Sequence, residues 1–165
     1  MKRLAAGLCT LALAAALVPA LSAASGAGAG ASVSGSGWRG NVTTPNTPIT
    51  HFAVSARNGA TGVTGTYGSM NAADALLNFR GDVTCLLAAG HRAVVGGVVT
   101  SGGEPGQVGT GFAVGFVDNA SPTADRITFT DVELAPPVDC VAEAALFVLP
   151  TFPVLRGNVE VESAS

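Results

Sequence analysis

The stretch FRGDVTCLLAAGHRAVVGGVV, residues 79–99, decides the fold class. Two runs rich in valine, leucine and alanine flank a short segment that contains Gly90, and polar residues alternate with apolar ones in the first run. Alternation with a period of two, interrupted by a glycine-containing turn, is the pattern of a β-hairpin. We therefore predict antiparallel strands over residues 79–87 and 92–100.

The register of this hairpin determines which side chains face the core. A turn centred on Ala89-Gly90 would place Cys85 opposite Val94. Successive side chains on a strand point to opposite faces of the sheet. This register predicts a single apolar face, which is formed by Phe79, Val83, Cys85, Leu87, Val94 and Val98.

Cys85 and His91 also raise the alternative of a functional site, because a nearby cysteine and histidine can form a nucleophile with its base or a pair of metal ligands. A strand rises about 3.3 Å per residue, so a cysteine within the strand lies far from a histidine at its turn. This distance argues against a hydrogen-bonded dyad. We interpret His91 as a solvated turn residue.

The same period of two recurs along the rest of the chain. In THFAVSAR, Phe52, Val54 and Ala56 alternate with other residues, and Asn58-Gly59 is suited to a tight turn. A turn or short helix is expected at 71–77, and further strands are expected at 109–118, 126–134, 140–149 and 154–162. We predict an all-β fold, either an antiparallel sandwich or a small barrel of about eight strands. Glycines inside the strands favour the strong coiling of a barrel.

The N-terminus has the order of a secretory signal peptide. Lys2 and Arg3 precede an apolar run that ends at Pro19 and a cluster of small residues. The run is shorter than the roughly 20 residues that a membrane-spanning helix needs. We predict a cleaved signal peptide over residues 1–24, a flexible Gly/Ala/Ser linker over 25–37 and a single β domain over 38–165, secreted and without a membrane span.

Removal of the predicted leader also removes Cys9 and leaves two cysteines, Cys85 and Cys140. In an exported protein, an even pair of cysteines is normally a disulfide. The bond would close a loop of 55 residues. In the chain-entropy model this closure stabilises the fold by about 4 kcal/mol.

Composition excludes some classes of partner. The predicted mature chain has no lysine, six scattered arginines and eleven acidic residues. It therefore lacks the basic stripe of a nucleic-acid-binding protein and the polybasic patch of a membrane-surface protein, and it cannot use a lysine nucleophile. No sequence motif indicates a cofactor.

Three groups of residues are candidates for a functional site. Asp118, Asn119 and Asp125 bracket a polar loop and form a weak calcium candidate, although they lack the regular spacing of a known calcium loop. His51 alternates out of phase with its apolar neighbours and is expected to face solvent. Trp38 and Tyr67 are candidates for lining a carbohydrate or other ligand surface. No Gly-x-Ser-x-Gly motif is present to mark a hydrolytic nucleophile.

Residues 76–130 resemble a group of small exported bacterial β proteins of uncharacterised function. The segments VTCLLAAGHRAVVGGVV and FAVGFVDNASPTADRITF carry the resemblance through a cysteine-bearing strand, a turn, an Ala-x-Val-x-Gly strand and an Asp-Asn-x-x-Pro loop. His91 stands where the group usually has asparagine, and Ala120 where it has glycine. The resemblance implies an all-β fold and implies no activity.

The sequence is therefore expected to encode an exported, non-catalytic β module with a binding, cell-surface or structural role. Its partner would be a protein, a cell-wall component or a small molecule. Two alternatives remain open, namely a small barrel that carries an apolar ligand, and a barrel enzyme, such as an isomerase, cyclase or hydrolase, whose site forms only in three dimensions.

Overall fold

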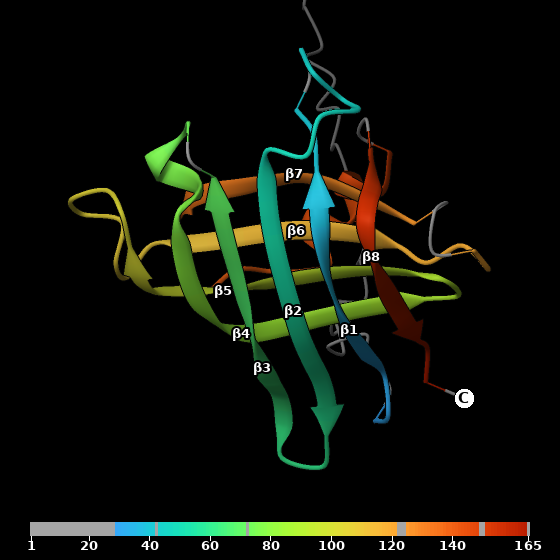
Figure 1. Cartoon of the computed structure of the whole chain (residues 1–165). Helices are drawn as coiled ribbons and strands as arrows, with labels where there is room; N and C mark the ends of the chain where they lie inside the picture. The colour runs from blue at the N-terminus through green and yellow to red at the C-terminus, as the bar shows by residue number, and fades with distance from the viewer. Residues whose placement is uncertain (1–28, 42, 72, 122–124, 149–150, 165) are drawn as a thin grey trace, which may run out of the picture.

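The protein is a closed antiparallel β-barrel of eight strands in which each strand pairs with its neighbours in sequence and β8 pairs with β1. The computed structural model describes residues 29–41, 43–71, 73–121, 125–148 and 151–164, without the side chains of residues 147 and 148. The elements are β1 (Ser32–Arg39), β2 (Thr50–Gly59), β3 (Gly62–Asn71), η1 (Ala75–Leu77), β4 (Phe79–Ala89), β5 (Arg92–Gly102), β6 (Gly111–Val117), β7 (Arg126–Leu134), η3 (Ala142–Val148) and β8 (Phe152–Glu162). In Figure 1, β1, β2 and β3 cross β6 and β7 at a steep angle, as expected for a small, strongly coiled barrel. The structure thus confirms the predicted all-β class and gives the barrel form.

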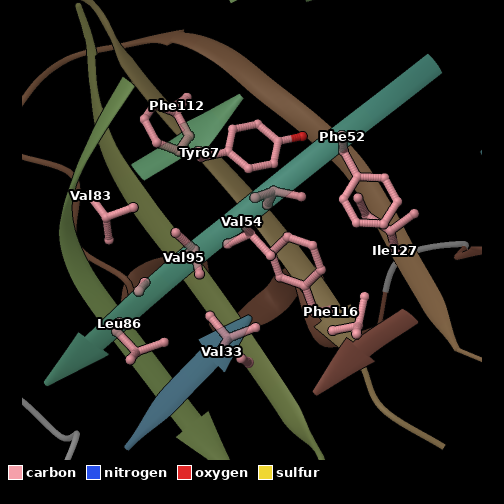
Figure 2. Close-up of a cluster of buried hydrophobic side chains, with 14 of the residues drawn as sticks. Val33, Phe52, Val54, Tyr67, Val83, Leu86, Val95, Phe112, Phe116 and Ile127 are labelled. Atoms are coloured by element: carbon pink, nitrogen blue, oxygen red, sulfur yellow. The ribbon is translucent and has the colours of Figure 1, made fainter. Parts of the chain in front are cut away.

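Aromatic rings fill the interior of the barrel. Tyr67 contacts Phe112, Phe79 and Phe116, with ring centroids 5.3, 5.7 and 6.4 Å away. Figure 2 shows Tyr67 beside Phe112, with Phe116 and Phe52 further along the same interior. Gly81 and Gly97 make room for these rings, because a Cβ at either position would collide with the Phe112 side chain. The glycines that we noted inside the strands therefore complement large residues on neighbouring strands.

Residues 32–37 were expected to belong to a flexible linker, and this expectation is wrong, because they form most of β1. The strand pairs with β2 on one side and with β8 on the other. Backbone hydrogen bonds hold such a strand and do not require large side chains. A Cβ at Gly35 would lie 2.8 Å from the Cα of Val159, so the close approach of β8 demands a small residue there. Residues 1–28, which contain the predicted signal peptide, lie outside the described residues.

The predicted register of the central hairpin is also wrong. Ala89 pairs with Arg92, and Cys85 pairs with Gly96 instead of Val94. Thr84 is an extra residue between Val83 and Cys85, which marks a β-bulge. A bulge reverses the alternation of side chains beyond it, so Cys85 leaves the face of Phe79 and Val83 and points to the outside of the barrel.

The turn predicted at Asn58-Gly59 is also displaced, although the ladder of β2 and β3 is continuous. Gly59 pairs with Gly62, so the loop is Ala60-Thr61, and Gly62 has the positive φ of 107°. Glycine adopts such angles at low cost. The hairpin itself is confirmed, with its turn two residues later than expected. In the 71–77 segment the predicted short helix is present as η1, and Asp74 caps it by accepting a hydrogen bond from the Leu76 amide.

The outer faces of β5 and β6 are covered by the segment that precedes β8. We expected a strand at 140–149, whereas Ala142–Val148 forms the 3-10 helix η3. Val138, Cys140 and Leu146 of this segment pack with Val94 and Ala113 in a second hydrophobic cluster. We call residues 138–146 the covering segment. Both faces of β5 and β6 are therefore buried, which accounts for their nearly continuous apolar sequences.

Gly96 lies beneath the covering segment, and its lack of a side chain is required there. A Cβ at this position would be 2.7 Å from the Sγ of Cys85 and 2.7 Å from a methyl carbon of Val138. We expect Gly96→Ala to lower the free energy of unfolding by about 1–3 kcal/mol, the usual effect of overpacking a core. Guanidinium chloride denaturation measures it. Gly68→Ala, whose Cβ would meet its nearest neighbour at 3.8 Å, is the matched control and is expected to change little; equal losses in both variants would contradict this account.

Candidate functional site

Cys85 and Cys140 form a disulfide, with their sulfur atoms 2.09 Å apart and their Cα atoms 5.8 Å apart. The bond joins β4 to the covering segment. Cys85 is therefore not the partner of His91, which is exposed in the β4–β5 turn, where its carbonyl accepts the Asp118 amide. Within the described residues, no group of three or more His, Cys, Asp or Glu side chains is placed to hold a metal ion.

The calcium candidates have structural partners. Asp125 is fully buried, and its two carboxylate oxygens accept the backbone N–H groups of Asn119 and Val159, each at 2.9 Å. Asp118 accepts the N–H of Val161 at 3.0 Å. These bonds continue the seam between β7 and β8, where the pairs Arg126–Pro153 and Ile127–Phe152 form the strand ladder. Both carboxylates thus substitute for a neighbouring strand along β8.

His51 and Trp38 lie side by side on the outer wall. They are paired in register between β1 and β2, and their rings meet edge to face with centroids 5.2 Å apart. Met70 is the next residue across, paired with His51 on β3. His51 is half-buried beside Trp38, whereas Met70 is 65% exposed and Trp38 is 38% exposed. His51 therefore faces outward as predicted, although against an indole ring.

The row formed by Trp38, His51 and Met70 borders two adjoining open depressions, each of about 540 Å³. The first follows β2, β3 and β4, and its lining includes His51, Arg80 and Asp82. The second lies at the end of these strands and is lined by Trp38 and Ile49, among others. Ser69, Met70, Phe79 and Arg80 line both. We call the two together the wall groove.

Tyr67, the other residue predicted to line a ligand surface, lies along the first depression of the wall groove, but its ring is buried in the barrel. Its hydroxyl lies 2.9 Å from Oγ1 of Thr130. Burial raises the pKa of the Tyr67 phenol, while the bond to Thr130 and the charge of Arg39 act in the opposite direction. Tyr67 is thus a neutral hydrogen-bonding group inside the barrel.

Sequence reasoning missed Arg39 and the polar wall of the groove. Met70, Arg80 and Asp82 come together through strand register, which the sequence does not display. Arg39, in contrast, shares the period of Val33 on β1 and would have been placed on the inner face if 32–39 had been recognised as a strand.

A comparison of the chain with protein-family models, with curated sequences and with solved structures finds no match. Among the helices in the described part of the chain, none is long and apolar enough to cross a membrane. The fold defines the protein as a small closed antiparallel β-barrel, and its function has to be argued from its surface and its interior.

Proposed function

We propose that the chain is an exported, non-catalytic binding module that holds a glycan of the cell surface in the wall groove. The observation that carries this proposal is the groove itself, an open depression of mixed character next to the exposed Trp38. The filled aromatic interior favours a ligand on the outer wall over an apolar ligand inside the barrel.

The side chains of the groove match the chemistry of sugars. A sugar ring presents apolar C–H faces and a belt of hydroxyls that donate and accept hydrogen bonds. The indole of Trp38 and the thioether of Met70 offer apolar surface, and contact with His51 holds the indole in place. Arg80 can donate hydrogen bonds to sugar hydroxyls and Asp82 can accept them, and both lie on the same outward face of β4.

Export is part of the proposal and has separate support. The N-terminal sequence has the order of a signal peptide, and disulfides such as Cys85–Cys140 persist in oxidising compartments. The predicted mature chain has no lysine and few charges, which suits binding to wall polysaccharides, where strong positive charge would give unspecific binding.

Trp38→Ala tests the proposal. We expect the variant to bind insoluble cell-wall polysaccharide and soluble glycan fragments about 10- to 30-fold more weakly than the unaltered protein, because an anchoring tryptophan is commonly a dominant contact. Co-sedimentation and isothermal titration calorimetry measure the affinity. Val108→Ala removes another exposed apolar side chain, 60% exposed in the β5–β6 connection, and should bind normally. The proposal fails if the unaltered protein binds no glycan, or if both variants bind equally well.

A further inference from the structure

Arg39 is an arginine in the interior of the barrel. It is the last residue of β1, is 1% exposed and pairs in register with Thr50, which is itself buried. Its guanidinium lies over the ring of Phe152, with the central carbon 5.5 Å from the ring centroid. A charged side chain in such a position normally has a partner of opposite charge.

The hydrogen bonds of Arg39 leave one edge of its guanidinium unused. Nη1 donates to the carbonyl of the adjacent Gly40 at 3.1 Å. Nε and Nη2 are buried and have no hydrogen-bond partner in the described part of the chain. Nη2 is the terminal nitrogen on the same side of the guanidinium as the Nε–H, so the two nitrogens direct parallel N–H bonds along one edge. This edge is the fork that binds two oxygens of a carboxylate or phosphate.

Among the described residues, no carboxylate supplies a counter-charge to this fork. All eleven acidic residues of the sequence lie in the part of the chain that the structure describes, and none of them hydrogen-bonds or pairs with Arg39. Asp125, the fully buried carboxylate, is engaged by the backbone amides of Asn119 and Val159. Burial lowers the pKa of Arg39, as it does for a cation without a partner. An uncompensated buried charge destabilises a fold, so a bound anion would relieve it.

The same end of the barrel holds neutral donors and meets the wall groove. Thr50, opposite Arg39, accepts a hydrogen bond from Asn71 of β3, and Ser69 lies two residues before Asn71. Ser69 is itself buried, and it lines both depressions of the wall groove. Ser69 therefore marks the place where the wall groove reaches the polar end of the interior.

We propose that Arg39 is an oxyanion-binding site, which receives a carboxylate or phosphate group through the fork formed by Nε and Nη2. The surrounding aromatic core restricts the anion to a small group. Such a group belongs either to a free anion or to an acidic sugar bound in the wall groove. The second source is included because Ser69 and Trp38 lie both near Arg39 and along the wall groove.

Thermal unfolding of the full, oxidised chain distinguishes these sources. The probes are inorganic phosphate, acetate and glucuronate, with chloride at equal ionic strength and glucose as controls. We expect at least one oxyanion to raise the Tm by about 10 °C at a concentration near 100 times its Kd. A rise with phosphate or acetate identifies a free-anion site, and a rise with glucuronate alone identifies an acidic sugar.

Arg39→Met and Arg39→Lys assign the effect to the fork. Arg39→Met removes the charge at similar length, and we expect a Tm equal to or above that of the unaltered protein in chloride, with loss of the oxyanion shift. Arg39→Lys keeps the charge without the fork and should retain less than half of the shift. Calorimetric titration of the unaltered protein gives the Kd independently of variant folding.

The inference is overturned if no oxyanion raises the Tm of the unaltered protein beyond chloride, or if Arg39→Met shows the same shift. The Arg39 anion site can be tested separately from the proposed function, because the Trp38→Ala variant should still show the rise in Tm with free phosphate or acetate. Glycan binding by the unaltered protein, together with the absence of any oxyanion shift in Tm, would leave the proposed function intact while the anion site fails.

Discussion

Replacing Cys85 and Cys140 together by alanine is expected to lower the free energy of unfolding by about 4 kcal/mol. The disulfide joins residues that are 55 positions apart, and without it the unfolded chain regains the conformational entropy of that loop. A typical domain has a stability of about 5–15 kcal/mol, so the loss is a large fraction of the total. The bond also fastens the covering segment over β5 and β6, where Val138 and Leu146 pack.

Guanidinium chloride unfolding, followed by far-ultraviolet circular dichroism, measures this loss. The unaltered protein in reductant should unfold at nearly the same midpoint as the double variant, because both lack the cross-link. The denaturant slope m should increase in both, since a chain without the loop exposes more surface when unfolded. A loss below 1 kcal/mol would mean that side-chain packing alone holds the covering segment.

The fold class was predictable because strand alternation is a local signal. Residues such as Phe52, Val54 and Ala56 are buried on one side of β2, as their period of two indicated. Local sequence does not reveal an extra residue in a ladder, so the bulge at Thr84 and the resulting position of Cys85 were missed. The predicted disulfide was confirmed despite the wrong register, because its prediction depended on the number of cysteines and on export.

Two segments were assigned wrongly because their structure depends on distant partners. The Gly/Ser composition of β1 is typical of a linker, yet the strand is held by backbone pairing with β2 and β8. Residues 142–148 are as apolar as a strand, yet the barrel is closed without them and they cover its outer face as η3. Tertiary context overrides local propensity in both cases.

The candidate site, too, was predictable where it depends on local alternation and unpredictable where it depends on the pairing of distant strands. The exposed position of Trp38 beside the outward-facing His51 agrees with alternation once both strands are known. The convergence of Met70, Arg80 and Asp82 requires the register of β3 against β4, and the isolation of Arg39 requires knowing where every carboxylate lies. Neither is a property of a short stretch of sequence, so both emerge with the folded chain.

Asp125→Ala is expected to cost about 4 kcal/mol of unfolding free energy. The variant leaves two backbone N–H groups, those of Asn119 and Val159, without the carboxylate that accepts them. Hydrogen bonds to charged groups contribute about 1.5–3 kcal/mol each, and a buried donor without a partner is itself unfavourable. Asp125→Asn keeps the shape, but its amide directs N–H toward a backbone N–H, so we expect a loss of about 2–3 kcal/mol.

Asp118→Ala is the matched control on the same seam. Asp118 accepts one N–H, that of Val161, and is half-buried, so its loss should cost about 1–2 kcal/mol. Denaturation gives the three stabilities, and hydrogen exchange should show faster exchange at the Val159 amide in Asp125→Ala than in Asp118→Ala. If the two alanine variants lose equal stability, the Asp125 carboxylate is not what joins β8 to β7. The strand pairs of β7 and β8 would then close the barrel by themselves.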